Sequence, residues 1–148
     1  MNNSEVIKEF DALIQLISRT FHSSGAAYLA GLDVTMQQFI VMKLIGEKER
    51  PRMTDLADDL GVTLGNMTTM VERLIKHGYI LRQDDPEDRR IVRVHLTAEG
   101  KNLIRKADER KKKTMEMILG KLSREDRQSL FKIMEKLVQA INQEKGEK

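Results

Sequence analysis

The fold is decided by residues 54–97, which read TDLADDLGVTLGNMTTMVERLIKHGYILRQDDPEDRRIVRVHLT. A short amphipathic helix is expected to begin after Thr54 and to end at Gly61, because glycine is typical of a helix C-terminus. Only two residues separate it from Thr63, which is expected to cap a second helix over residues 64–77. The second helix is expected to bury the face made of Met67, Met70, Val71 and Leu74. Two helices joined by so short a turn predict a helix-turn-helix.

The hydrophobic period changes directly after this second helix. Residues 79–82 are typical of a strand, residues 84–88 of a polar turn, and residues 91–96 alternate between apolar and polar side chains. The alternation predicts that the apolar members face the core, while Arg93 and His95 face outward. The segment therefore predicts a β-hairpin, a wing, attached to the helix-turn-helix.

Amphipathic helices flank this core. Thr35 and Gln38 form a capping box at the start of one helix, and apolar residues recur at helical spacing near both ends of the chain. We expect a mainly α fold with a small β-hairpin, in one domain over residues 1–148. A winged helix-turn-helix core at residues 32–97 is flanked by dimerisation helices at residues 1–31 and 98–148. The outer helices expose more apolar surface than the core can cover, which favours a two-fold dimer over a monomeric bundle that covers its own apolar faces.

Composition excludes several classes of protein. The chain has 148 residues, with 26 Lys and Arg against 23 Asp and Glu, and no cysteine, so it forms no disulfide and no thiolate metal site. No apolar run approaches the ~20 residues of a membrane helix, and the opening MNNSEVIKEFD is acidic where a signal peptide is basic. We therefore expect a cytoplasmic protein without membrane contact.

A helix-turn-helix with a wing fits duplex DNA, because one helix enters the major groove while the hairpin reaches an adjacent groove. The outer face of the second helix carries Gly65, Asn66, Thr69, Glu72, Arg73 and Lys76. Asn can bond adenine, Thr offers a methyl group and a hydroxyl, Arg can bond guanine or phosphate, and glycine lets the backbone approach closely. The alternative is an ordinary solvated helix face.

The wing carries Asp88, Arg89 and Arg90 just past its tip. Two guanidinium groups there can enter a narrow minor groove, with Asp88 holding one of them as an ion pair. The alternative is an exposed salt-bridge cluster that contributes about 0–1 kcal/mol to the stability of the fold. Residues 54–97 contain six Lys or Arg and eight Asp or Glu, so the DNA prediction rests on the geometry of the motif and not on a basic domain. The basic run at 101–113 favours a solvated helix face over phosphate contacts.

Enzymatic motifs are missing from the sequence. It contains no phosphate-binding glycine loop, no nucleophile motif and no cluster of histidine with carboxylates at catalytic spacing, so we expect no enzyme and no cofactor. His22, His77 and His95 fall on three different expected elements, so no metal site is expected either.

Three segments together resemble the MarR (multiple antibiotic resistance regulator) family over essentially the whole chain. They are Val34–Phe39 (VTMQQF), Asp88-Arg89-Arg90, and Leu96–Gly100 (LTAEG). The resemblance implies a homodimeric winged-helix regulator of transcription, usually a repressor that a small ligand releases from DNA. The predicted function is thus sequence-specific binding of double-stranded DNA at a pseudo-palindromic operator. A winged-helix module that binds protein and no DNA remains the alternative.

The resemblance also implies where the sites lie. Thr68 joins the residues of the recognition helix, and Arg90 matches the arginine of the minor groove with Asp88 as its orienting partner. The expected DNA-binding residues are Thr63, Gly65, Asn66, Thr68, Thr69, Arg73, Lys76, Asp88, Arg89 and Arg90. Family effectors occupy a pocket where the dimerisation helices meet the winged core. That location makes His22, Tyr28 and Phe39 candidate ligand-binding residues, although each is equally explained as core filling.

Overall fold

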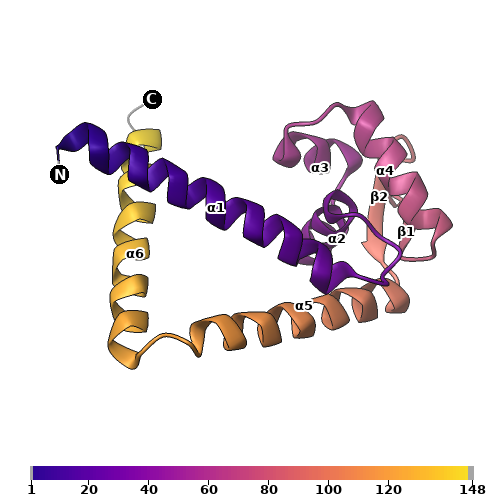
Figure 1. The fold of residues 1–148 in the computed structure, drawn as a ribbon. Helices are drawn as coiled ribbons and strands as arrows, with labels where there is room; N and C mark the ends of the chain where they lie inside the picture. The colour runs from indigo at the N-terminus through magenta and orange to yellow at the C-terminus, as the bar shows by residue number, and fades with distance from the viewer. Residues whose placement is uncertain (1, 147–148) are drawn as a thin grey trace. The chain divides into compact units, whose positions relative to one another are not determined.

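The computed structural model describes the backbone of residues 2–146 and the side chains of residues 2–19 and 27–143. Within these residues the elements follow in the order α1 (Asn3–Leu29), α2 (Met36–Lys48), α3 (Met53–Leu60), α4 (Leu64–Lys76), β1 (Ile80–Asp84), β2 (Val92–Leu96), α5 (Ala98–Leu119) and α6 (Arg124–Gly146) (Figure 1). The chain divides into two compact units, Met1–Arg110 and Lys111–Lys148. No helix in the described part combines the length and the apolar character needed to cross a membrane. The predicted mainly helical fold with a small hairpin is confirmed.

The core of the first unit is built from α2, α3, α4, the hairpin and the start of α5. Its largest fully buried side chains are Val41, Met42, Ile45, Leu56, Met67, Val71, Leu74, Ile80 and Val94. Each such side chain contributes roughly 1.5–3 kcal/mol by leaving water. Met70, which was expected in the core, is only partly buried, because it lines a recess between α2 and α4.

Local capping defines the helix-turn-helix. At the start of α2, Thr35 Oγ1 accepts from the N–H of Gln38 at 3.2 Å, and Gln38 Oε1 accepts from the N–H of Thr35 at 2.8 Å. Gly61 ends α3 with φ of +61°, a left-handed conformation that suits glycine. Thr63 Oγ1 accepts from the N–H of Asn66 at 3.2 Å and caps α4 as predicted.

The start of α3 differs from the prediction. The helix begins at Met53 and not after Thr54, and Arg52 is its N-cap residue. The carboxylate of Asp55 accepts from the N–H of Arg52 at 3.1 Å, so a side chain inside the helix supplies the cap. Helix caps usually begin with residues such as Ser or Thr, and for this reason the sequence predicts a start after Thr54.

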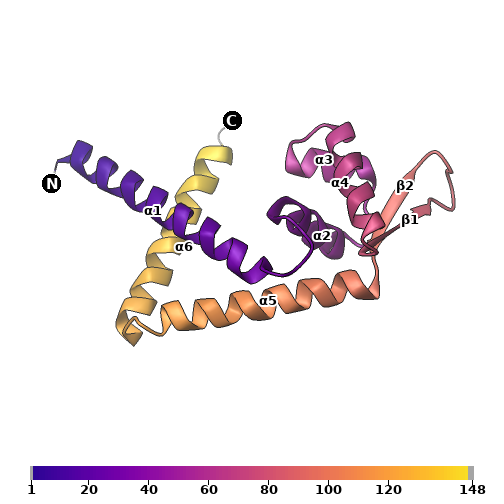
Figure 2. The ribbon, with the colours of Figure 1, turned by 45° about the vertical axis from the view of Figure 1, so that its right-hand side comes forward.

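The hairpin forms the wing, which projects beyond α4 (Figure 2). Its strands pair antiparallel from Ile80 opposite Leu96 to Asp84 opposite Val92. β1 therefore lies later than the predicted 79–82, because the N–H of Tyr79 still bonds the carbonyl of Leu74 and closes the end of α4.

The second strand differs from the alternation expected of it. Arg93 and His95 are half-buried and do not simply face solvent. Arg52, just before α3, forms an isolated antiparallel bridge with Arg93, so a segment of backbone covers the free edge of β2.

The outer helices are long and continuous. α1 runs without interruption through residues 23–25 to Leu29, and α6 continues to Gly146. Thr97 caps α5 by accepting from the N–H of Gly100 at 3.0 Å, and Ser123 caps α6 by accepting from the N–H of Asp126 at 3.0 Å.

Both α1 and α6 carry exposed apolar faces. In α1 the exposed apolar residues are Val6, Ile7, Phe10, Leu13, Ile14, Leu16 and Ile17. In α6, which belongs to the second unit, they are Leu130, Phe131, Ile133, Met134, Leu137, Val138 and Ile141. Faces of this size are typical of surfaces that another protein covers.

Candidate nucleic-acid interface

The outer face of α4 presents polar side chains to solvent. Asn66, Thr69, Arg73 and Lys76 are exposed, and Gly65 has open space where a Cβ atom would stand. Within the described part of the chain, the side-chain amide of Asn66 has no hydrogen-bond partner, so both its donor and its acceptor are available to a base edge.

Two threonines of this face use their hydroxyl protons inside the helix. Thr68 Oγ1 donates to the carbonyl of Leu64 at 2.8 Å, and Thr69 Oγ1 donates to the carbonyl of Gly65 at 3.1 Å. Each hydroxyl keeps its acceptor capacity but has no proton left for a base. The methyl groups are therefore the main feature that these residues can offer to DNA.

A recess of about 450 Å³ lies between the N-terminal ends of α3 and α4 and the wing. We call it the wing recess; its lining residues are Arg52, Met53, Thr54, Leu64, Thr68, Arg82, Arg90, Ile91 and Val92. Three arginines from different segments thus meet two threonines in one concave surface. The recess also brings together Thr68 of α4 and Arg90 of the wing, which lie far apart in the sequence.

A second recess of about 400 Å³ lies on the other flank of α4. Asn66, Thr69 and Met70 line it together with Gln37 and Ile40 of α2 and with Val41, Leu60 and Val62. The structure therefore places Asn66 and Thr69 on one flank of α4 and Thr68 on the other. Arg73 and Lys76 lie further along α4 and line neither recess.

The predicted ion pair of the wing tip is present. Arg90 Nε donates to Asp88 Oδ1 at 3.1 Å, and Arg90 Nη2 donates to Asp88 Oδ2 at 3.2 Å. The pKa of Asp88 lies below its ordinary value, chiefly because the side chain of Arg90 donates to the carboxylate and also because the N–H of Arg90 does so. The Arg90 side chain is 90% exposed, so the pair orients the guanidinium without burying it.

Local pairing explains how an acidic core can face a polyanion. Five of the eight acids in residues 54–97 accept from a cation or a backbone N–H, namely Asp55, Asp59, Glu72, Asp85 and Asp88. Four of the five are paired with a Lys or Arg side chain, and the field of such an ion pair falls off faster with distance than the field of a lone carboxylate.

Several residues of this surface are missing from the sequence prediction. Arg52, Thr54 and Arg82 line the wing recess, and Leu64 is half-exposed at the first position of α4. The signal that could have found Arg82 is its place on the first strand of the predicted hairpin, which directly follows α4. No local sequence pattern indicates that Arg52 belongs to this surface, because its position depends on the bridge to Arg93.

Two of the three candidate ligand residues, Tyr28 and Phe39, pack against each other at the junction of α1 and α2. Tyr28 and Phe39 form an edge-to-face pair with ring centroids 5.9 Å apart, and the Tyr28 hydroxyl donates to Met36 Sδ at 3.3 Å. Burial raises the pKa of Tyr28, and the charge of Asp108 adds to the increase. The side chain of His22 lies outside the described residues.

His77 makes contacts at the end of α4. His77 caps α4, and its Nε2 lies 2.9 Å from a carboxylate oxygen of Asp33, while its ring stacks on Tyr79. Among the described residues, no three His, Asp or Glu side chains gather as a metal site would require.

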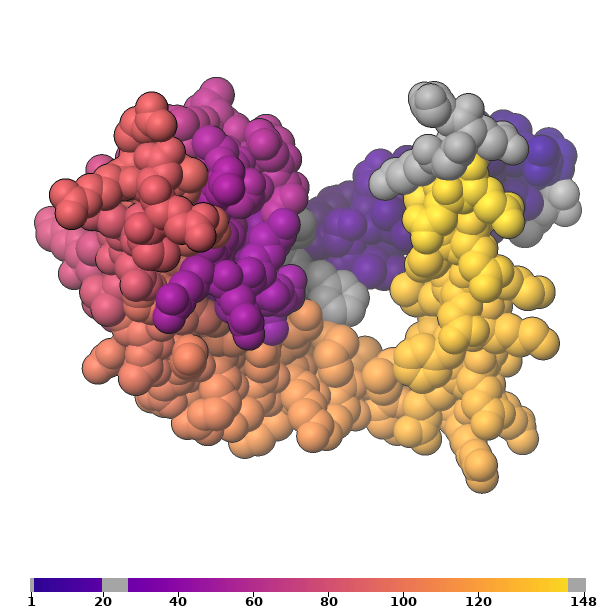
Figure 3. Space-filling view, turned by 180° about the vertical axis from the view of Figure 1, so that it is seen from behind, coloured from indigo at the N-terminus to yellow at the C-terminus, as the bar shows by residue number. Residues whose placement is uncertain are grey.

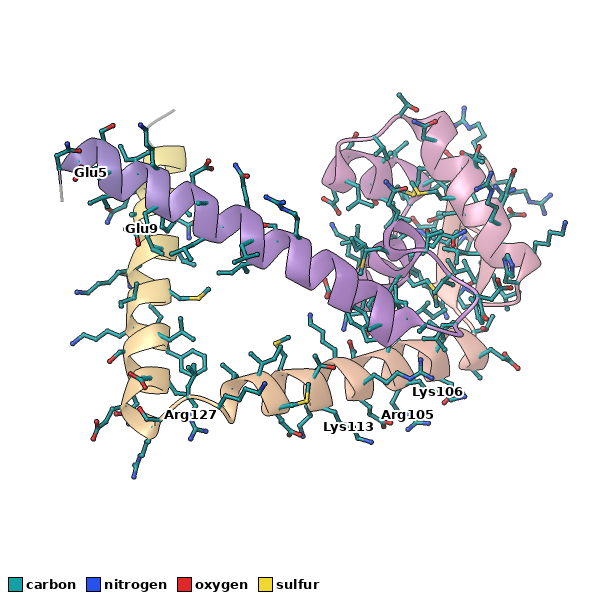
Figure 4. The ribbon with its side chains drawn as sticks, viewed as in Figure 1. Glu5, Glu9, Arg105, Lys106, Lys113 and Arg127 are labelled. Carbon is teal, nitrogen blue, oxygen red and sulfur yellow. The ribbon has the colours of Figure 1, made fainter. Side chains whose placement is uncertain are left out.

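Arg105 and Lys106 of α5, which belong to the first unit, lie apart from α4 (Figure 4). Arg105 pairs with Glu109 at 2.8 Å, and Arg110 donates to the carbonyl of Ala30 at 2.7 Å. Part of the positive charge of α5 is therefore used in contacts within the protein.

Comparison with known proteins gives a consistent result. The family model described as MarR family matches residues 34–92. An uncharacterized HTH-type transcriptional regulator of Bacillus subtilis, YfiV, is 32% identical over 116 residues, which cover 78% of this chain and 72% of that protein. The structure of a MarR family protein from Bacillus stearothermophilus superposes with a TM-score of 0.86 at 20% identity, covering 96% of this chain and 99% of the other. Streptococcus pneumoniae FabT, solved in complex with DNA, superposes with a TM-score of 0.76 at 24% identity, covering 95% and 99%.

Proposed function

The chain belongs to the MarR family of DNA-binding transcriptional regulators, which are not enzymes, and on that premise we propose that it binds double-stranded operator DNA with sequence specificity. Membership sets aside the alternative of a module that binds protein and no DNA. In this proposal α4 lies in the major groove and the wing in the adjacent minor groove. The protein acts in the cytoplasm as a homodimer on a pseudo-palindromic operator and represses transcription until a small ligand binds.

The wing recess is the observation that carries the proposal. When one element lies in the major groove and the next in the minor groove, the sugar-phosphate backbone between them passes over the protein surface that joins the two. That surface is lined by Arg52, Arg82 and Arg90 together with Thr54. Guanidinium and hydroxyl groups are the common protein partners of phosphate oxygens.

In this proposal, side chains of α4 and of the wing tip contact the edges of the DNA bases. Asn66 has a free amide for adenine, Thr69 offers a methyl group to thymine, and Arg73 extends the face toward guanine or phosphate. Arg90, oriented by Asp88, enters the minor groove, where Arg89 adds positive charge. Lys76 and Thr63 supply contacts at the two ends of the helix.

A second copy of the chain would cover the apolar faces of α1 and α6. A two-fold dimer places two α4 helices on successive major grooves, so the operator repeats with inverted symmetry. Tyr28 and Phe39, with His22 nearby in sequence, remain the candidate contacts for a ligand, because they lie where α1 joins the winged core.

The test is a titration of DNA fragments, including the region upstream of the protein's own gene, over a series of salt concentrations. We expect one fragment to bind far more tightly than the others, with affinity falling as salt rises. Equal affinity for all fragments would contradict sequence-specific binding.

Arg82→Gln tests the phosphate contact of the wing recess. Because a phosphate contact carries no sequence information, the variant should bind all sequences more weakly and lower the salt slope by about one unit per half-site. Arg105→Gln, which removes an exposed arginine from α5, is the matched control and should leave binding unchanged. An unchanged salt slope in Arg82→Gln would exclude this contact.

A further inference from the structure

Asp85 occupies an unusual position at the base of the wing tip. Of the charged residues whose side chains the structure describes, it alone is buried, with 8% of its surface exposed. Its Oδ1 accepts from the N–H of Glu87 at 3.0 Å and from the N–H of Asp88 at 3.3 Å. Its Oδ2 accepts from Arg93 Nε. A buried carboxylate with this many donors is fully paired, and the tip turn folds around it.

Arg93 extends the contact from the wing to the rest of the core. Its Nη1 donates at 3.0 Å to the carbonyl of Arg50, in the segment that joins α2 to α3. The N–H of Val94 donates to the carbonyl of Pro51 at 3.2 Å in the same place. Seen from behind, the wing and the region of α2 lie against one another (Figure 3). The hairpin is thus attached at its side as well as at its base.

The segment that receives Arg93 has an uncommon backbone. Glu49 and Arg50 have φ values of +47° and +61°, a left-handed conformation that residues other than glycine seldom adopt. Such a conformation persists only where surrounding contacts hold it. The bonds from Arg93 and Val94 are two such contacts, so the orientation of the wing and the shape of this segment depend on each other.

We propose that Asp85 and Arg93 are positioning residues for DNA binding, which fix the wing tip so that Asp88 can present Arg90 to the minor groove. The inference rests on the proposed function and deepens it. The path is continuous: Arg50 carbonyl, Arg93, Asp85, the N–H of Asp88, and the Asp88 carboxylate that holds Arg90. Neither Asp85 nor Arg93 needs to touch DNA.

Electrostatics alone and the positioning role predict opposite effects on DNA affinity when Asp85 is neutralised. Neutralising Asp85 removes a negative charge near a polyanion, so simple electrostatics predicts tighter binding by Asp85→Asn. Positioning predicts weaker binding, because a loosened tip must be ordered when DNA binds. That cost corresponds to about 2- to 10-fold in affinity for each wing.

The experiment is a double-variant cycle in the full-length protein. The parent, Asp85→Asn, Arg90→Ala and the combined variant are titrated by fluorescence anisotropy against one fragment that the parent binds, at one salt concentration. We expect Asp85→Asn to weaken binding in the parent and to have no further effect when Arg90 is already absent. Equal losses in both backgrounds, or tighter binding by Asp85→Asn, would overturn the proposal.

A second readout separates positioning from general loss of stability. The four proteins are compared on operators with A·T-rich and with G·C-rich flanks, because a narrow A·T minor groove attracts arginine most strongly. We expect Asp85→Asn to lose the A·T preference together with affinity, as Arg90→Ala does. A variant that binds both operators more weakly by the same factor would show a purely structural role and overturn the proposal.

Glu109→Gln is the matched control, since it also removes a carboxylate paired with an arginine but lies on α5. It should leave binding unchanged. Should Asp85→Asn fail to fold, Arg93→Gln breaks the same contact from the other side and leaves the tip bonds of Asp85 in place. A parent that binds no fragment overturns the proposed function and this inference with it, whereas additive losses in a parent that binds DNA overturn this inference alone.

Discussion

The hydroxyl of Thr69 illustrates how a single contact changes the chemistry that a residue offers. Sequence reasoning credits threonine with both a hydroxyl and a methyl group for base contacts. In the structure the hydroxyl proton is bound to the carbonyl of Gly65, one turn earlier in α4. The methyl group is what remains for an apolar contact with thymine.

Replacement of Thr69 by Val or Ser tests this assignment. Thr69→Val keeps the methyl group and the branched shape, so operator affinity should stay close to that of the parent. Thr69→Ser keeps the hydroxyl and loses the methyl group, so affinity should fall by about 1 kcal/mol wherever thymine is contacted. Titration of both variants on one operator measures the difference. Loss of affinity in Thr69→Val, with Thr69→Ser unchanged, would show that the hydroxyl is the reading group.

Two glycines show how the same substitution acts differently on different elements. Gly65 lies in the first turn of α4 with open space around it, whereas Gly100 is buried in the first turn of α5. An added Cβ at Gly100 would collide with the carbonyl oxygen of Tyr79 and approach Leu96 Cδ2 to 3.3 Å. The absence of a Cβ at Gly100 thus lets the start of α5 pack closely against the backbone of Tyr79 and the side chain of Leu96.

Alanine at each glycine therefore has a different expected result. Gly100→Ala should destabilise the fold by about 2 kcal/mol or more, because backbone cannot move aside as a flexible side chain can. Gly65→Ala should leave the fold as stable as the parent or stabilise it by up to about 1 kcal/mol. It should nevertheless weaken DNA binding, because its methyl group stands on the face that approaches the groove. Urea unfolding and operator titration measure the two effects; undiminished DNA binding in Gly65→Ala would place Gly65 away from the DNA.

At the scale of the whole molecule, the described part of α6 carries an exposed apolar face, as α1 does. Ile133, Leu137 and Ile141 follow one another at four-residue steps, and each is at least 41% exposed. The opposite face of α6 carries charged and amide side chains. An amphipathic helix with its apolar side in water is expected to pair, since burial of that side is the main source of association energy.

Leu137→Asp tests the dimer. A charge in the centre of the apolar face should shift the protein toward a 17.1 kDa monomer, because burying an unpaired carboxylate is costly. Gln139→Asp introduces the same charge on the polar face of α6 and should leave the dimer intact. Sedimentation velocity at micromolar concentration distinguishes the species. A parent that sediments as a monomer, or a Leu137→Asp variant that stays dimeric, would contradict the assignment of α6 to the interface.

The sequence by itself determined the elements whose signals are local. The caps at Thr35, Thr63 and Thr97 and the turn at Gly61 join residues three or four positions apart, so propensity and spacing suffice to predict them. The same is true of the Asp88–Arg90 pair, whose members are two residues apart. The winged helix-turn-helix follows from these signals and from the change of hydrophobic period.

Only the tertiary structure decided how the wing is attached and which side chains share a surface. Arg93 bonds a carbonyl 43 residues away, and the wing recess collects arginines from three segments. Strand alternation predicts that Arg93 faces outward. It contains no information about the backbone before α3, which pairs with β2 and makes this side chain half-buried. Contacts between distant segments depend on how the elements pack, and packing is a property of the folded chain that no local pattern contains.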